Sequence, residues 1–185
     1  MKKVLVPLAP GFEEIEAITV IDILRRAGLA VTVAGTVPGP ITASRQTQHL
    51  PDCLLDDVRA AEFDLIVLPG GQPGTQHLRA DPRLQAMLSV HHARRRPIAA
   101  LCATPTILAA TGLLRDRRAT SHPGVRAEVA AAAREYTEDR VVADEEIITS
   151  RAAGTAMELA FALVERLCGP AKAAEVNASV LARLS

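Results

Sequence analysis

The chain has 185 residues, with 21 acidic and 21 basic side chains and only 2% aromatic residues. This length suits one domain with its own core. The balanced charge and the lack of stacking aromatics argue against nucleic acid or an anionic membrane as a partner. Three widely spaced cysteines form neither a zinc pattern nor a disulfide framework. No apolar run approaches the roughly 18 residues of a membrane span, and the first one is too short for a signal peptide. We therefore expect a cytoplasmic protein.

Short apolar runs alternate with helical patterns along the chain. Strands are expected at residues 3–8, 30–34, 64–68 and 98–101, around 41 and 47–50, and more weakly at 141–142 and 147–149. Helices are expected at residues 14–27, 82–95, directly after Cys102, 155–167 and 171–181. Continuous apolar strands separated by helices favour a doubly wound α/β domain, with a mostly parallel sheet covered on both faces.

Four polar segments follow expected strands. Ligands in such sheets bind at the carboxyl ends of the strands. The first strand is followed by residues 13–16 and the third by Gly70 and Gly71. The next strand ends at Cys102, and His122 follows a further short strand-like stretch. The pattern predicts a nucleophile, a carboxyl group, backbone donors and an imidazole at one rim of the sheet.

Cys102 stands between an apolar run and a helix-start signal, in which Thr104 is the expected N-cap and Pro105 lies in the first turn. A cysteine at this turn faces backbone N–H groups and the positive end of a helix dipole. We expect this placement to lower the pKa of the thiol. The same turn presents the nucleophile in several α/β hydrolases. The alternative interpretation is a small buried residue with a packing role.

Glu16 is the unusual carboxylate of the first helix, because Val20 and Ile23 on its own face indicate a buried side. A buried carboxyl group tends to be protonated, and it can then donate a hydrogen bond to a thiolate or transfer a proton. The alternative is one more negative charge near a helix N-terminus.

Gly70 and Gly71 directly follow a buried strand, where glycine allows backbone N–H groups to approach a reacting oxygen or thiolate. A plain turn is the alternative. Residues 70–74 match no nucleotide-binding motif, and no helix is expected to begin directly after them. The arginine-rich helix end suggests that His91 and His92 are solvated. Cys53 and Cys168 are interpreted as packing residues.

Taken together, the motifs resemble the ThiJ/PfpI superfamily, and within it the DJ-one branch and its bacterial members. The resemblance extends from residue 3 to the last helix. It rests on Glu-Glu-Ile-Glu at 13–16, Leu-Pro-Gly-Gly at 68–71, Ala-Ala-Leu-Cys-Ala at 99–103 with Pro105, His-Pro at 122–123 and Thr-Ser-Arg-Ala-Ala-Gly-Thr at 149–155.

This resemblance implies a flavodoxin-like sandwich formed by a single class I glutamine amidotransferase-like domain over residues 1–185, and a homodimer. It implies that the nucleophile is an elbow cysteine and that a protonated carboxyl group is hydrogen-bonded to it, with no metal and no cofactor. The implied site consists of Cys102 as nucleophile, Glu16 as acid, His122 as the nearby histidine, and Gly70, Gly71 and Ala103 as backbone donors.

The resemblance also implies a small aldehyde or a glycated protein as substrate. The expected activity is that of a cofactor-independent glyoxalase or deglycase acting on methylglyoxal, glyoxal or their early protein adducts. An oxidation-sensing, chaperone-like stress protein is the alternative. A PfpI-type peptidase is less well supported, because no histidine directly follows Cys102. Two residues depart from the family pattern, since Thr104 replaces a glycine or alanine and Ala153 replaces a common proline.

Overall fold

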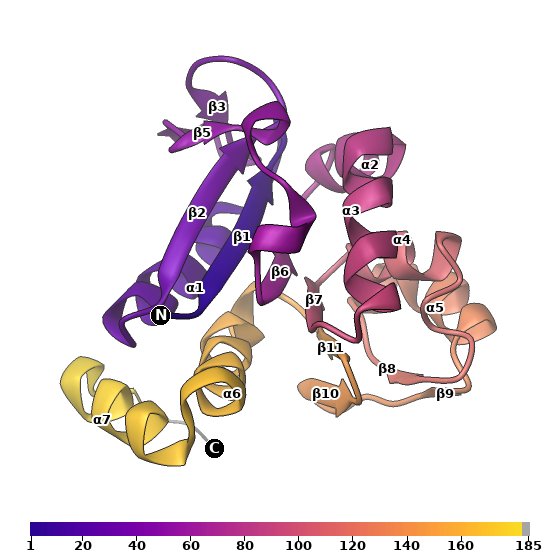
Figure 1. Ribbon diagram of the computed structural model, residues 1–185. Helices are drawn as coiled ribbons and strands as arrows, with labels where there is room; N and C mark the ends of the chain where they lie inside the picture. The colour runs from indigo at the N-terminus through magenta and orange to yellow at the C-terminus, as the bar shows by residue number, and fades with distance from the viewer. Residues whose placement is uncertain (183–185) are drawn as a thin grey trace.

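A seven-stranded sheet with helices on both faces organises residues 1–182, which are the residues that the computed structural model describes (Figure 1). The strand order is β10-β11-β7-β6-β1-β2-β5, in which β10 is antiparallel to β11 and all other neighbours are parallel. These strands are β1 (Lys3–Leu8), β2 (Ala30–Gly35), β5 (Cys53–Leu54), β6 (Leu65–Leu68), β7 (Ile98–Leu101), β10 (Val141–Asp144) and β11 (Ile147–Ser150). Two small ladders pair β3 (Ile41–Thr42) with β4 (Gln48–His49) and β8 (Arg118–Ala119) with β9 (Glu135–Tyr136).

Side chains alternate across the sheet, and each face therefore has its own apolar core. In β1, Val4 and Val6 point into one core while Leu5 points into the other. The first core lies under α1 (Glu14–Arg26), α6 (Ala156–Cys168) and α7 (Pro170–Val180). The second lies under α2 (Gly74–Ala80), α3 (Pro82–Ala93), α4 (Pro105–Ala110) and α5 (Arg126–Ala132). Burial on both faces explains why the central strands are continuous apolar runs.

The expected α/β class, with its mostly parallel sheet, is confirmed, and the main strands begin and end within two residues of their expected positions. Two helices were not expected. The segment at α5 has little apolar periodicity, and Val129 is its only buried residue. The expectation that no helix begins after residues 70–74 is wrong, because α2 begins at Gly74. A Cβ there would lie 2.6 Å from the backbone nitrogen of Phe12, so only glycine lets the helix start in this place.

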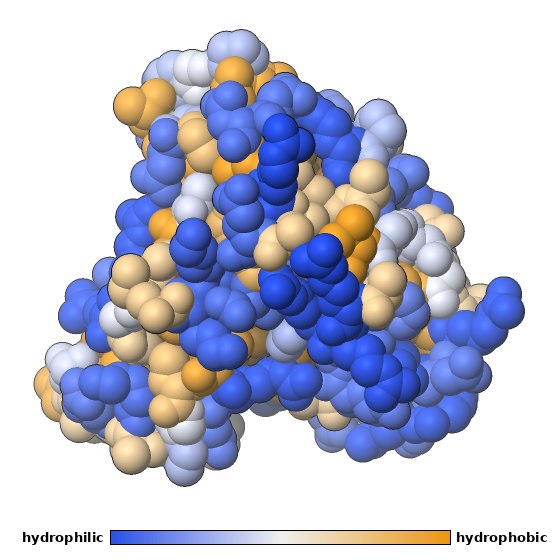
Figure 2. Space-filling model, in the orientation of Figure 1, coloured by the Kyte–Doolittle hydropathy of each residue, from blue (hydrophilic) through white to orange (hydrophobic). Residues whose placement is uncertain are grey.

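Hydrophilic residues dominate the face shown in Figure 2, and hydrophobic residues are dispersed among them. Elsewhere on the molecule, α1 exposes two isoleucines, Ile15 at 57% and Ile18 at 40%. Within residues 1–182, no helix combines the length and apolar character that a membrane crossing requires.

His91 is buried, so the expectation of a solvated histidine is wrong. Its ring nitrogens lie 3.3 Å from the carbonyl oxygen of Pro97 and 3.1 Å from that of Ala60, and the residue is 0% exposed. His91 continues the buried stripe of α3 through Leu84 and Leu88. The neighbouring arginines concealed this helical spacing in the sequence.

The burial of His91 makes stability depend on pH. Burial lowers the pKa of His91 below its ordinary value of 6.5, so the folded state binds fewer protons there than the unfolded state. The stability that neutral His91 contributes is therefore complete above pH 6.5 and is lost as the pH falls below 6.5. We expect the urea midpoint of wild type, compared with that of His91→Asn at each pH, to fall between about pH 7.5 and about pH 5.5, since all other groups titrate alike in the two proteins. The exposed His77 provides the control, since His77→Gln should keep the wild-type slope. Equal slopes for wild type and His91→Asn would contradict this origin.

Candidate active site

Cys102 occupies a strained turn between β7 and α4. Its φ of +66° lies in the left-handed region, which side-chain-bearing residues rarely adopt. Both backbone groups of Cys102 are bonded, with its N–H 3.0 Å from the Ser150 oxygen and its carbonyl accepting the His122 N–H at 2.9 Å. The flanking segments thus hold the strained turn in place. The predicted strand-to-helix elbow is confirmed.

Glu16 projects from α1 toward this elbow and is only 1% exposed, as its helical face predicts. One carboxyl oxygen, Oε2, accepts the Gly70 N–H at 2.7 Å, while the other, Oε1, is buried without a hydrogen-bond partner among the described residues. The carboxyl group lies beside the Cys102 thiol, close enough to interact with it. Burial raises the pKa of Glu16 to about 7, although the Gly70 N–H acts in the opposite direction. Near neutral pH, a substantial fraction of molecules therefore holds a proton on Glu16.

The two positions after β6 require glycine because other parts of the site lie too close to leave room for a side chain. A Cβ on Gly70 would lie 2.8 Å from both Cys102 Cβ and Glu16 Oε2. Gly71 has a φ of +95°, and a Cβ there would lie 2.4 Å from the Glu13 backbone nitrogen. Any larger residue would push this loop away from the sulfur.

The sequence predicts three backbone donors at the cysteine, namely Gly70, Gly71 and Ala103, but only two of them face the sulfur. The N–H groups of Gly71 and Ala103 lie close enough to the Cys102 sulfur to lower the pKa of its thiol. The Gly70 N–H instead bonds to the Glu16 carboxyl group. Gly70 therefore orients the acid, while Gly71 and Ala103 are placed to stabilise negative charge at the sulfur or at an atom bound to it.

The expectation of a lowered cysteine pKa is wrong for this arrangement. Burial, followed by the Glu16 carboxylate, raises the pKa of the Cys102 thiol to about 12, and the two backbone N–H groups offset only part of this. Helix α4 has only six residues, so its dipole is outweighed by the adjacent carboxylate. A thiolate near neutral pH therefore requires Glu16 to hold the proton, since the carboxyl O–H can then donate to the sulfur.

His122 lies beside the elbow on the exposed segment after β8. Its Nδ1 accepts the Gly124 N–H at 3.0 Å, so the neutral ring carries its proton on Nε2. In the described part of the chain, no hydrogen bond joins this ring to the Cys102 or Glu16 side chain. His122 is therefore placed to contact a bound molecule rather than to activate the thiol directly.

These groups line a pocket of about 550 Å³ at the carboxyl end of the sheet. The sequence predicts the residues around the sulfur but not most of the other lining residues, including Glu13 and Ala152, which lie in motifs but carry no predicted role in the site. The missed lining residues are Glu13, Ser44, Arg45, Gln72, Gly124, Val125 and Ala152. The loop that carries Arg45 is fixed to α1, since the Arg45 N–H donates to the Glu14 carboxylate at 3.0 Å.

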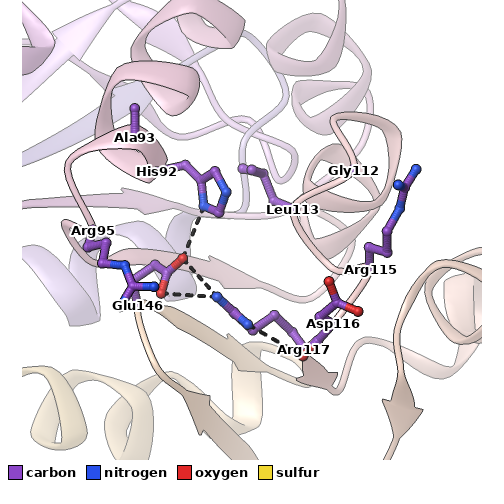
Figure 3. A pocket seen from close by; sticks show the side chains of 9 residues that line it. All are labelled: His92, Ala93, Arg95, Gly112, Leu113, Arg115, Asp116, Arg117 and Glu146. Carbon is purple, nitrogen blue, oxygen red and sulfur yellow. Dashed lines mark hydrogen bonds and ion pairs between the residues drawn. The ribbon is translucent and has the colours of Figure 1, made fainter.

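A second pocket, of about 380 Å³, lies at the other end of the sheet (Figure 3). There the buried Glu146 lies 3.1 Å from Arg117 and 3.0 Å from His92. The Ile98 N–H donates to the Glu146 carbonyl at 2.8 Å, which places the network at the start of β7. None of the predicted site residues lines this pocket. Residues 1–182 contain no group of three or more His, Cys, Asp or Glu residues suited to a metal ion.

The sheet, the strained cysteine elbow and the facing buried glutamate define a nucleophile-elbow α/β protein. The chain belongs to the DJ-1/PfpI family, whose model matches residues 2–166. The zebrafish (Danio rerio) Parkinson disease protein 7 homolog is 40% identical over 97% of both chains. The Caenorhabditis elegans glutathione-independent glyoxalase DJR-1.2 is 38% identical over 92% of this chain and 91% of its own. The structure of oxidized Toxoplasma gondii DJ-1 superposes with a TM-score of 0.94, at 36% identity over 100% of both chains.

Proposed function

We propose that this protein is a cofactor-independent glyoxalase that converts methylglyoxal or glyoxal to the corresponding 2-hydroxy acid. The observation that carries the proposal is the buried Glu16 carboxyl group beside the Cys102 thiol, with its Oε1 free of any other hydrogen-bond partner in the described residues. A nucleophile and a proton carrier are thus paired in a pocket of about 550 Å³. The relative from C. elegans that is named a glutathione-independent glyoxalase supports the same assignment.

The first step is nucleophilic addition. Glu16 takes the thiol proton, and the Cys102 thiolate attacks the aldehyde carbon to form a C–S bond. The aldehyde oxygen becomes an alkoxide, which the N–H groups of Gly71 and Ala103 are placed to stabilise. Glu16 then gives its proton to this oxygen, which completes a hemithioacetal and leaves a carboxylate.

The second step moves a proton between carbons. The Glu16 carboxylate removes the proton from the carbon bonded to sulfur, and the electron pair shifts onto the neighbouring carbonyl oxygen to give an enediolate. Glu16 returns this proton to the neighbouring carbon, and the hydroxyl proton on the first oxygen passes to the second, which gives a thioester and a 2-hydroxyl group. The Nε2–H of His122 can hydrogen-bond to the enediolate oxygen. Water then attacks the thioester carbon, the C–S bond breaks, and the 2-hydroxy acid leaves with the thiol restored.

The same chemistry extends to early glyoxal adducts on proteins. An aldehyde bound reversibly to an amine or thiol can be transferred to Cys102 once it is released in the pocket. The pocket is open and its rim includes the small residues Ala152 and Ala153, which suits a substrate attached to a larger chain.

Lactate production from methylglyoxal alone tests the proposal. The purified protein, without glutathione or metal, should produce one lactate for each methylglyoxal consumed. The matched control is Cys102→Ser under the same conditions. Loss of methylglyoxal without lactate formation would indicate trapping by protein side chains and would contradict an enzymatic role.

An oxidation-sensing role is the second candidate. The Gly71 and Ala103 N–H groups beside the Cys102 sulfur could equally stabilise the oxygens of an oxidised cysteine, and the related T. gondii DJ-1 has been solved in an oxidized form. A sensor of this kind would become oxidised at Cys102 under dilute peroxide but would produce no lactate, so the same assay separates the two candidates.

We also propose that the protein is a homodimer formed through α1. Ile15 and Ile18 are exposed beside a shallow groove lined by Ile23, Met157 and Val180. A two-fold interface, in which the same patch meets itself, is the commonest way to cover such a surface.

Light scattering at micromolar concentration should therefore give the mass of a dimer. Ile18→Arg should shift the protein to a monomer, because it would bury two unpaired charges in the interface. Leu50→Arg provides the control, since Leu50 is exposed apolar surface outside α1. A wild-type monomer would refute this interface.

A further inference from the structure

The buried hydroxyl group of Thr104 hydrogen-bonds to both β6 and β7 just beyond the last backbone pair between these strands. The β6–β7 ladder ends with the pair formed by Leu68 and Ala100. Just beyond it, the Thr104 hydroxyl accepts the Leu101 N–H at 2.9 Å. Its own proton can be donated to the Leu68 carbonyl oxygen, at 2.7 Å, or to the Leu101 carbonyl oxygen, at 2.8 Å, and the shorter of these bonds joins β6 to β7. Thr104 occupies the expected N-cap position of α4, but its side chain makes no capping hydrogen bond.

The two backbone groups joined by this hydroxyl lead directly into the candidate site. Leu68 is followed by Pro69 and by Gly70, whose N–H bonds to the Glu16 carboxyl group. Leu101 is followed by Cys102. One side chain thus connects the loop that supplies the backbone donors to the elbow that supplies the sulfur.

Thr104 is 0% exposed and does not line the pocket, so it does not touch a bound substrate. Without its hydroxyl group, the Leu68 carbonyl and the Leu101 N–H would both lose a buried hydrogen bond. The loop and the elbow could then move apart, because the regular ladder no longer joins them at this point.

We infer that Thr104 is a positioning residue, whose hydroxyl group sets the distance between the Gly70–Gly71 donors and the Cys102–Glu16 pair. Its effect on turnover rests on the proposed glyoxalase function, but its effect on the reactivity of Cys102 does not. The thiol can be titrated by alkylation whether or not the protein has an enzymatic activity.

Thr106 provides a matched control in the same helix. It is 4% exposed, and its hydroxyl group donates to the Ala103 carbonyl at 2.7 Å, a bond confined to its own helical turn. A valine at either position replaces a buried hydroxyl group with a methyl group. Only the change at Thr104 removes a link between β6 and β7.

The experiment measures alkylation of Cys102 by iodoacetamide against pH, by intact mass, in a Cys53→Ser/Cys168→Ala background. Thr104→Val should move the inflection that reports Glu16 upward by about one pH unit, because the carboxyl group loses part of its Gly70 hydrogen bond. Its kcat for methylglyoxal should fall about tenfold with a smaller change in KM. Thr104→Ser keeps the hydroxyl group and should stay within about threefold of wild type.

Thr106→Val should reproduce the wild-type pH profile even if its melting temperature falls. A Thr104→Val protein that is less stable but keeps the wild-type profile would overturn the inference, since Thr104 would then be only structural. If Thr104→Val does not fold, Thr104→Ala decides: a wild-type profile overturns the inference and an upward shift supports it. If no variant and no wild-type protein produces lactate, the proposed function fails while the alkylation profiles still decide the role of Thr104.

Discussion

Cys102→Ser should reduce lactate formation from methylglyoxal by at least about 10³-fold while leaving the fold intact. A serine hydroxyl is a much weaker acid than a thiol, and Glu16 cannot deprotonate it to a useful extent. The smaller oxygen fits the same elbow, since the strain at φ +66° belongs to the backbone and is shared by both residues. The measurement is steady-state turnover, with circular dichroism and a melting curve on the same sample.

The other two cysteines supply the controls for this prediction. Cys53 is half-buried in β5, whereas Cys168 is exposed, so the interpretation of Cys168 as a packing residue is wrong. Cys168 is the last residue of α6, beyond the part of the helix that faces the core. Cys53→Ser and Cys168→Ala should each keep most of the activity. Near wild-type turnover in Cys102→Ser would remove the nucleophile from the mechanism.

Glu16→Gln should lower turnover by about 10²–10⁴-fold, the range associated with general acid–base catalysis. The amide oxygen can still accept the Gly70 N–H and the amide N–H can still donate to sulfur, so the local geometry is retained. The variant cannot accept the proton from the hemithioacetal carbon. Glu16→Asp should also be impaired, because its shorter side chain withdraws the carboxyl group from Cys102. Full activity in Glu16→Gln would leave Glu16 as a helix-terminus charge.

Glu16→Gln should also make the folded protein more stable than wild type at high pH. The pKa of Glu16 is raised from 4.5 to about 7, so the folded state binds a proton that the unfolded state has released. The stability linked to this proton is complete below about pH 4.5 and is lost as the pH rises through about 7. As the pH rises between these limits, the free energy of unfolding of Glu16→Gln should therefore increase relative to that of wild type by up to roughly 3 kcal/mol, measured by urea unfolding. A pH-independent difference would contradict the raised pKa.

The sheet and the convergence of the site could be predicted from the sequence because both follow from local patterns. Continuous apolar runs define strands buried on both faces, and the carboxyl ends of parallel strands meet at one edge. Residues as distant as Glu16, Gly70 and Cys102 were placed together by this rule alone. The helical spacing around Glu16 also predicted its burial correctly.

Properties that depend on three-dimensional neighbours could not be predicted in this way. The thiol pKa is set by burial and by a carboxylate from another element, which outweigh the local helix dipole. The sequence position of Thr104 predicts a helix cap, whereas in the structure its hydroxyl group hydrogen-bonds to residues of β6 and β7. Arg45 lines the pocket only because its loop folds against α1, where the Arg45 N–H donates to Glu14. In each case, the partner lies far away along the chain.

Alkylation of Cys102 against pH, in wild type and in Glu16→Gln, tests the central claim that a shared proton controls the thiol. Both proteins carry Cys53→Ser and Cys168→Ala, so that Cys102 is the only reactive sulfur. In wild type the rate should rise with an inflection near pH 7, where the pair loses its first proton, and should rise again toward pH 12. Glu16→Gln should lack the inflection near pH 7. The same inflection in both proteins would show that Glu16 does not hold the proton that governs Cys102.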